Sequence, residues 1–311
     1  MPDLHAARTP VFYFLGVTTG QSSIMKVFPR WARALKIEAE MKGIDLPPHA
    51  PSAEYRRAVE FLKTDPLSLG ALVTTHKLDL FKACRDMFGY IDPFAEKLNE
   101  VSCLSKRDGL FRAHAKDPIS SGLALESFVP PGFWARYGGE VLLLGAGGSS
   151  LAMALYFSQE KFGSNVPGRI TIANRSEARL ISARAALQGL NKNIEFRFIH
   201  NLRPEDNDAL IAALPPRSLV VNATGLGKDA PGSPTTSGVS YPRDSLVWEI
   251  NYRGDLLFKR QAETQQRKKR LHIEDGWMYF IFGWTQVISE VFNIDIPPST
   301  LERLSAIAKE S

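Results

Sequence analysis

Residues 140–157, EVLLLGAGGSSLAMALYF, contain the clearest fold signal of this chain. The first part of this stretch is a short apolar run typical of a buried β-strand, its centre is a glycine-rich turn, and its end has the apolar composition of a buried helix. In this order the three parts form a dinucleotide-binding fingerprint, because glycines let the backbone approach a pyrophosphate at the helix N-terminus. We therefore expect the nucleotide to be bound by Gly145, Ala146, Gly147, Gly148, Ser149 and Ser150.

The alternation of strand and helix continues on the C-terminal side of this turn. The expected strands are RITIANR (169–175), IEFRFIH (194–200), SLVVNAT (218–224) and SLVWEINY (245–252), with helices from Ser176 and around 207–214 between them. Two helices, 277–292 and 299–309, then close the chain. We predict a doubly wound Rossmann-type domain over residues 122–274, followed by C-terminal helices, 275–311, that return to pack on the first domain.

The N-terminal part also alternates between β-type and helical segments. Strands are expected at VFYFLGV (11–17) and LGALVTT (69–75), helices around 27–35, 52–63 and 77–88, and a hairpin within 100–116. The hairpin should turn at Asp108-Gly109, because this dipeptide tolerates the positive φ angles of a tight turn. The chain is thus predicted to be an α/β protein of two domains, with a substrate-binding domain over residues 1–121.

Composition limits the classes of function. The 311 residues are 44% hydrophobic and 23% charged, which describes a soluble globular chain and excludes disorder, collagen-like repeats and a disulfide scaffold. The net charge of +5 suits a small anionic substrate at least as well as nucleic acid, and the basic run 267–270 is expected to end a solvated helix. Both cysteines are expected to be reduced, no metal-ligand spacing is present, and no export signal or membrane span is expected. We expect a cytoplasmic monomer or homodimer.

Two further loops refine the nucleotide site. An NAD site places an acidic residue at the end of the second strand, whereas this strand ends in Asn174, Arg175 and Ser176, with Arg179 one helical turn later. Two guanidinium groups match a 2′-phosphate, so we predict NADP; the alternative is that both arginines are solvated surface charge. The loop after the strand at 218–221 adds Asn222, Thr224 and Gly225 to the predicted cofactor residues, although it could be an ordinary glycine turn.

Hydride transfer between a nicotinamide and a carbonyl needs a nearby group that exchanges a proton with the substrate oxygen. Lys77 follows an expected strand and is the first residue of an expected helix. The positive end of the helix disfavours an ammonium group there, so Lys77 should release its proton more easily. Asp117, between the hairpin and the next helix, is the candidate carboxylate that orients it. The alternatives are a solvated surface lysine and a helix N-cap, respectively.

With these motifs in order, the sequence resembles the shikimate dehydrogenase family over nearly its whole length. The resemblance rests on VTTHK (73–77), Asp117, GAGGSS (145–150), NRSEAR (174–179) and NATGLG (222–227). These are followed by Glu249 to Tyr252, Asp275-Gly276 and the helix that holds Gln286. The resemblance implies NADP-dependent oxidation of a hydroxyl group in the shikimate pathway of aromatic amino acid biosynthesis, with Lys77 and Asp117 handling the proton. It also implies that Gly276 belongs to the cofactor site and that the substrate is held by Ser22, Ser23, Thr74, Ser102, Tyr252 and Gln286.

The departures from the family pattern lie on the substrate side. The family's serine, any residue, serine, proline reads Ser22-Ser23-Ile24-Met25, its asparagine-threonine step reads Ser102-Cys103, and the two residues before the aspartate read Ala115-Lys116. Loss of hydrogen-bond partners leaves polyol hydroxyls unpaired. From the resemblance we expect the substrate to be shikimate, quinate or another cyclic hydroxy or keto acid. The alternative is a catalytically silent module that senses NADP or a metabolite on the same fold.

Overall fold

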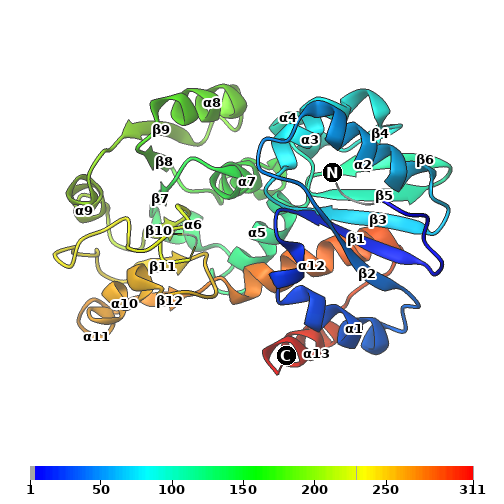
Figure 1. Cartoon of the computed structure of the whole chain (residues 1–311). Coiled ribbons are helices and arrows are strands. Elements are labelled where there is room, and N and C mark those ends of the chain that lie inside the picture. Colours follow the sequence, from blue (N-terminus) through cyan, green and yellow to red (C-terminus); the bar gives the residue numbers. More distant parts are fainter. Residues whose placement is uncertain (1–3, 229, 311) are drawn as a thin grey trace. The chain divides into compact units, whose positions relative to one another are not determined.

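The computed structural model describes residues 4–228 and 230–310, and these form two compact units (Figure 1). Unit 1 contains residues 4–116 and 283–310, and unit 2 contains residues 117–282. The C-terminal segment thus joins the N-terminal unit, as the sequence predicted. The predicted domain boundaries after residues 121 and 274 lie a few residues from these divisions and stay a prediction.

Unit 1 is built on a mixed six-stranded sheet with the order β2-β1-β3-β5-β6-β4. Its strands are β1 (Val11–Gly16), β2 (Glu40–Asp45), β3 (Ser68–Val73), β4 (Tyr90–Ile91), β5 (Cys103–Arg107) and β6 (Leu110–His114). Strands β1, β2 and β3 are parallel, whereas β5 is antiparallel to both β3 and β6. Asp108 and Gly109 join β5 to β6 with φ angles of 54° and 72°, so the predicted hairpin is confirmed.

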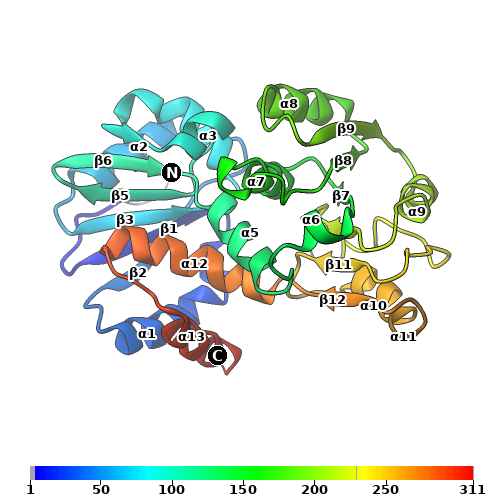
Figure 2. The same ribbon diagram turned by 180° about the vertical axis from the view of Figure 1, so that it is seen from behind.

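Helices cover both faces of this sheet (Figure 2). They are α1 (Ile24–Leu35), α2 (Ser52–Thr64), α3 (Lys77–Cys84), α4 (Pro93–Leu98), the part of α12 (Trp277–Phe292) from residue 283, and α13 (Pro298–Lys309), with short 3-10 turns η1 (Thr19–Gln21) and η2 (Arg85–Met87). Successive side chains of a strand point to opposite faces. Phe12 therefore packs on Phe28 of α1 and Phe292 of α12, while Tyr13 packs on Phe61 of α2.

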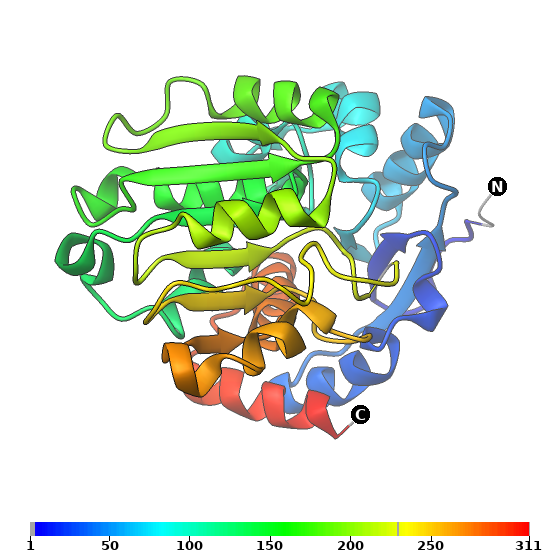
Figure 3. The same cartoon turned by 90° about the vertical axis from the view of Figure 1, so that its left-hand side faces the viewer.

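Unit 2 is a six-stranded, fully parallel sheet whose strands lie one above another in Figure 3. Its strands are β7 (Val141–Leu144), β8 (Arg169–Asn174), β9 (Glu195–His200), β10 (Leu219–Asn222), β11 (Leu246–Glu249) and β12 (His272–Glu274). The spatial order β9-β8-β7-β10-β11-β12 corresponds to 3-2-1-4-5-6, the strand order of a Rossmann fold. The predicted doubly wound domain is confirmed.

The helices of unit 2 are α5 (Asp117–Glu126), α6 (Phe133–Tyr137), α7 (Gly148–Phe157), α8 (Glu177–Leu187), α9 (Pro204–Ala212), α10 (Leu257–Glu263), α11 (Gln266–Lys269) and the start of α12, with the 3-10 turn η3 (Glu160–Phe162). One core cluster joins Leu142 and Leu144 of β7 to Ile211 of α9 and Phe258 of α10. Val141 and Leu143 are fully buried as well, so both faces of β7 are covered. The basic run 267–270 ends a short helix, α11, as expected. The sequence pattern missed α10 and β12, because they are only seven and three residues long.

Candidate active site

The glycine turn after β7 has the geometry that the sequence predicted. Gly145 has a φ of 112°, and a Cβ there would lie 2.5 Å from the carbonyl oxygen of Ala223, so only glycine fits. Gly147 is the N-cap of α7, and a Cβ on it would meet open space. The buried Ser150 hydroxyl donates to the Gly145 carbonyl at 2.7 Å and fixes the turn. The turn therefore leaves room at a helix N-terminus, where an anion is stabilised.

The end of β8 presents positive charge. Ser176 caps α8 by accepting a hydrogen bond from the Arg179 amide at 3.4 Å, and the Asn174 side chain donates to the Ser176 carbonyl. The side chains of Arg175 and Arg179 are exposed on either side of this cap. Glu177, in the first turn of α8, is also exposed. The two guanidinium groups can thus reach an anionic group without first leaving a buried ion pair.

The third predicted loop is organised by Asn222 at the end of β10. Its side-chain oxygen accepts from the amide and the hydroxyl of Thr224, at 3.1 and 2.7 Å. Its side-chain amide donates to Glu249 at 2.7 Å. Gly225 follows with a φ of 79°, which favours glycine. The loop geometry is therefore set by a buried polar group rather than by glycine alone.

Glu249 begins the stretch Glu249 to Tyr252 that belongs to the family resemblance, but the sequence predicted no role for its side chain. It is 0% exposed, and it accepts hydrogen bonds from the Asn222 side chain and from the amide and side chain of Asn251. Burial raises the pKa of Glu249 to about 7, with a smaller contribution from the charge of Asp275, although all three hydrogen bonds oppose that rise. An acidic residue within the apolar run SLVWEINY was the available signal.

The start of α12 packs on the segment that follows β11 in unit 2. Gly276 donates its amide to the Asn251 carbonyl, and a Cβ at this position would overlap the backbone of Ile250. Tyr252 packs on Phe280 with ring centroids 4.5 Å apart and ring planes tilted by 34°. Gly276 and Tyr252 were predicted to bind cofactor and substrate, respectively, and both assignments stay predictions.

In unit 1, Lys77 lies where β3 gives way to α3. Thr74 donates its amide to Leu15 of β1, and Thr75 has a φ of 58°, which is strained for a β-branched residue. His76 is the N-cap of α3, and Lys77 is its first residue. Lys77 is partly buried, and its carbonyl accepts from the amide of Val101.

His76 is held from a neighbouring helix. Its Nδ1 lies 3.0 Å from the hydroxyl of Tyr55 on α2, and both side chains are 1% exposed. The contact fixes the imidazole, and the backbone of the same residue starts the helix that carries Lys77.

The other predicted substrate residues of unit 1 surround the ends of β1 and β3. Ser22 ends the turn η1 after β1, and Ser23 is the N-cap residue of α1. Ser102 is 3% exposed, and its carbonyl accepts from the Val73 amide at the end of β3. Because β1 and β3 are adjacent and parallel, these serines and Thr74 lie at the same sheet edge.

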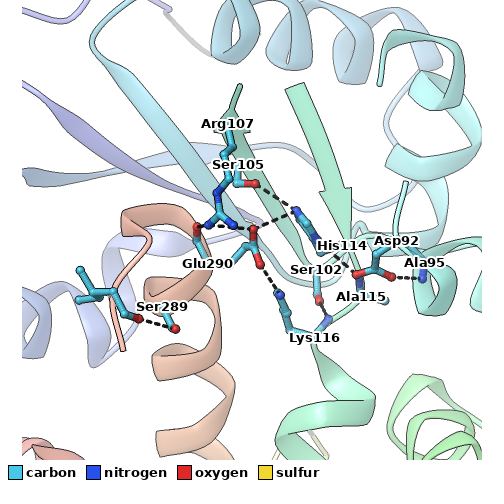
Figure 4. A network of polar contacts seen from close by, with 11 residues as sticks. Asp92, Ala95, Ser102, Ser105, Arg107, His114, Ala115, Lys116, Ser289 and Glu290 are labelled. Atoms are coloured by element: carbon cyan, nitrogen blue, oxygen red, sulfur yellow. Dashed lines mark hydrogen bonds and ion pairs between the residues drawn. The ribbon is translucent and has the colours of Figure 1, made fainter. Parts of the chain in front are cut away.

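Ser102 leads to a polar network around Lys116 (Figure 4). The Lys116 amide donates to the Ser102 hydroxyl oxygen at 2.8 Å, and the Lys116 ammonium donates to Glu290 at 2.7 Å. Glu290 lies one helical turn after Gln286 on α12, so the two side chains share a helix face. Lys116 thereby joins Ser102 to Glu290, which lies on the same helix face as Gln286. In the sequence, Lys116 is a departure from the family pattern.

Asp117 begins α5 in unit 2, and its carbonyl accepts from the Ser120 hydroxyl. Lys77 belongs to unit 1, so the pairing of Lys77 with Asp117 stays a prediction. The same holds for every predicted catalytic, substrate and cofactor residue.

The described residues were searched for metal-ligand groups, disulfides and membrane-spanning helices. Residues 4–228 and 230–310 contain no group of three or more His, Cys, Asp or Glu side chains placed to hold a metal ion. Cys84 and Cys103 are both buried free thiols, and burial raises the pKa of Cys84 to about 12. Among the helices of the described chain, none combines the length and apolarity needed to cross a bilayer.

Comparison with known proteins confirms the resemblance to the shikimate dehydrogenases. No family model matches the chain. A curated protein from Methylobacterium radiotolerans, shikimate dehydrogenase (NADP(+)), is 24% identical over 248 residues, which are 79% of each chain. The crystal structure of shikimate 5-dehydrogenase from Thermus thermophilus in complex with NADP(H) and shikimate is similar with a TM-score of 0.69 and 19% identity, covering 96% of this chain and 99% of that one.

The same fold also occurs with another named activity. The ligand-free 5-ketofructose reductase of a Gluconobacter strain is similar with a TM-score of 0.70 and 15% identity, covering 96% of this chain and 98% of that one. At these identities the structural similarities establish the fold of this chain. The predicted α/β architecture is confirmed, and the prediction of NADP as cofactor agrees with the names of the first two relatives.

Proposed function

We propose that this chain, a relative of the shikimate dehydrogenases in sequence and fold, is an NADP-dependent oxidoreductase that interconverts a cyclic hydroxy acid and its keto form. The observation that carries the proposal is the similarity to a curated NADP-dependent shikimate dehydrogenase over 79% of both chains. The Rossmann strand order and the open glycine turn at Gly147 support a dinucleotide cofactor.

NADP fits the residues of unit 2. The N-terminus of α7 is an anion site for the pyrophosphate, and the exposed side chains of Arg175 and Arg179 match a 2′-phosphate. The cofactor supplies the hydride chemistry when bound. The protein contributes the fixed turn, the positive charge and the loop at Asn222.

Lys77 and Asp117 are proposed to exchange the proton of the substrate hydroxyl. Lys77 begins α3, where the helix N-terminus disfavours the ammonium form and makes proton release easier. His76, held by Tyr55, fixes the start of this helix. Asp117 supplies the negative charge that orients the ammonium during the transfer.

The substrate is proposed to be a small anionic molecule bound by Ser22, Ser23, Thr74, Ser102, Tyr252 and Gln286. Ser102 already accepts a hydrogen bond from the Lys116 amide, so its hydroxyl offers the ligand mainly a donor. Ala115, fully buried, offers only a methyl group. This site is therefore proposed to offer a substrate fewer hydrogen-bond partners than a site that binds every hydroxyl of shikimate.

The test is turnover with purified protein and NADP+ against shikimate, quinate and their aminated analogues, measured by absorbance at 340 nm. We expect activity with at least one of these acids and none after Lys77→Ala, with NADP+ affinity little changed. Lys82→Ala, an exposed lysine on the same helix, is the matched control. NADP+ binding without turnover across the panel would instead favour the sensing module.

Cofactor choice is tested by calorimetry. The double variant Arg175→Ala, Arg179→Ala should weaken NADP+ binding at least about tenfold and leave NAD+ binding nearly unchanged, since only NADP+ carries the 2′-phosphate. Tighter binding of NAD(H) than of NADP(H) by the unaltered protein would contradict the assignment.

A further inference from the structure

Unit 2 contains a cavity of about 350 Å³ that the proposed function does not use. It is lined by the C-terminal ends of α5 and α7, the chain that leads from α5 to α6, and η3 with the residues after it (Figure 2). Protein pockets for small molecules have volumes of about 300–1,000 Å³, so this cavity is large enough for a ligand. We call it the α5–α7 pocket.

Aromatic side chains form much of the wall of the α5–α7 pocket. Trp134 of α6 meets Phe157 of α7 edge to face, with ring centroids 5.5 Å apart. Tyr156 meets Phe162 of η3 in the same way at 4.9 Å. Trp134, Tyr156 and Phe157 are each buried, so their rings are fixed by packing. Such a wall favours a ligand with a flat apolar ring, which can add further edge-to-face or stacked contacts.

The charge in the pocket is negative. Among the described residues that line it, Glu126 alone is charged. The Tyr156 hydroxyl donates to Glu126 Oε1 at 2.7 Å and holds the carboxylate at the aromatic wall. Burial, this hydrogen bond and the charge of Glu126 raise the pKa of Tyr156, so the phenol keeps its proton and remains the donor. A carboxylate accepts several hydrogen bonds, and Glu126 can therefore also bind a protonated amine.

Hydrogen bonds hold the chain around the pocket in place. The Phe133 amide donates to the Pro130 carbonyl at 3.1 Å, and Gly132 between them has a φ of 74°. The Ala135 amide donates to the side-chain oxygen of Asn165 at 3.1 Å, which ties the chain after η3 to α6. Because these walls are already ordered, a ligand does not have to order them when it binds.

Lys161 shows that the same rings accept a cation. Its ammonium lies 4.8 Å from the ring centroid of Phe162 and 5.6 Å from that of Tyr156. Lys161 is exposed and is not among the residues that line the pocket. Its charge is therefore screened by solvent and leaves the carboxylate of Glu126 available to a ligand.

We propose that the α5–α7 pocket binds a small aromatic amine, with its ring against Trp134, Tyr156 and Phe157 and its ammonium group at Glu126. The glycine turn lies at the opposite end of α7, which has ten residues and is therefore about 15 Å long. The amine and a nucleotide at the glycine turn can thus be bound at the same time. This site does not depend on the proposed reaction, because binding of the amine requires no turnover.

The probes are tryptamine, its neutral analogue tryptophol and the anion indole-3-propionate. Each is titrated by calorimetry into the whole protein, with and without saturating NADP+. Tryptamine should bind at least about fivefold more tightly than tryptophol, and Glu126→Gln should remove most of this preference. Glu160→Gln is the matched control, because Glu160 is an exposed acid on η3 outside the pocket lining, and it should leave the preference unchanged.

A second variant tests the place of binding. Val129 is a half-buried lining residue, and Val129→Trp should fill part of the cavity and weaken both tryptamine and tryptophol by about tenfold or more. The thermal transition and the NADP+ affinity of this variant show whether unit 2 is folded. Glu126 is exposed, so Glu126→Gln tests the charge without disturbing the core.

Four results would overturn the proposal. They are tryptamine binding weaker than about 1 mM, equal or tighter binding of tryptophol or indole-3-propionate, an unchanged preference in Glu126→Gln, and unchanged tryptamine affinity in folded Val129→Trp. Competition between tryptamine and NADP+ would place the amine at the glycine turn and would overturn it as well. Absence of turnover with the acids, in contrast, refutes only the oxidoreductase and leaves these titrations valid.

Discussion

Glu249 should give the stability of unit 2 a measurable dependence on pH. Its carboxyl group is fully buried at the end of β11, and burial raises its pKa from 4.5 to about 7. Such a group binds its proton more tightly in the folded than in the unfolded chain. Its stabilising contribution is therefore complete below pH 4.5 and falls as the pH rises through the interval from 4.5 to 7.

The magnitude follows from the shift. A rise from 4.5 to about 7 corresponds to a loss of about 3 kcal/mol in the free energy of unfolding between the two ends of that interval. Glu249→Gln keeps the shape of the side chain and removes the titration. We expect the unfolding free energy of the unaltered protein, minus that of Glu249→Gln, to decrease by roughly this amount from pH 4.5 to pH 8.

The assay is urea unfolding of both proteins at several pH values, supported by hydrogen exchange of the β10 and β11 amides. Glu195→Gln is the control, because hydrogen bonds from Arg197 and Arg169 lower the pKa of Glu195. A lowered pKa affects stability only as the pH falls below 4.5, so this variant should show no slope between pH 5 and 8. A flat difference for Glu249→Gln, or one that grows with pH, would refute the reasoning.

Three other substitutions test parts of the same framework. Tyr55→Phe should lower kcat severalfold and leave NADP+ affinity unchanged, because it frees the imidazole of His76 at the start of α3; a change in cofactor affinity alone would contradict this role. Gly276→Ala should destabilise unit 2 by about 1–3 kcal/mol in urea unfolding, because its methyl group overlaps the backbone of Ile250. Trp31→Phe should cost about 1–3 kcal/mol, because the buried indole donates to a carbonyl of α13 at 2.8 Å; a thermal transition identical to that of the unaltered protein would disprove the contact.

Short-range patterns were sufficient for most of the fold. The run from Glu140 to Phe157 predicted β7, the turn and α7, and the Asp108-Gly109 dipeptide predicted the hairpin. These signals are local, because a strand, a glycine at positive φ and a helix each depend on neighbouring residues. The same pattern failed for α10 and β12, which are too short to show a period.

The local sequence also predicted which candidate residues lie at helix starts. Lys77 begins a helix and Gly147 caps one, as expected from the order of strand, turn and helix. The sequence also showed that Lys116 departs from the family pattern, but it did not show that Lys116 pairs with Glu290.

Only the tertiary structure could pair Lys116 with Glu290, since the two residues are 174 positions apart and meet because α12 returns to the first sheet. The burial of Glu249 between Asn222 and Asn251 was equally beyond the sequence. The physical reason is the same in both cases: the ionisation of an acid depends on its neighbours in space and on the water excluded around it, and neither quantity is set by the residues next to it in the chain.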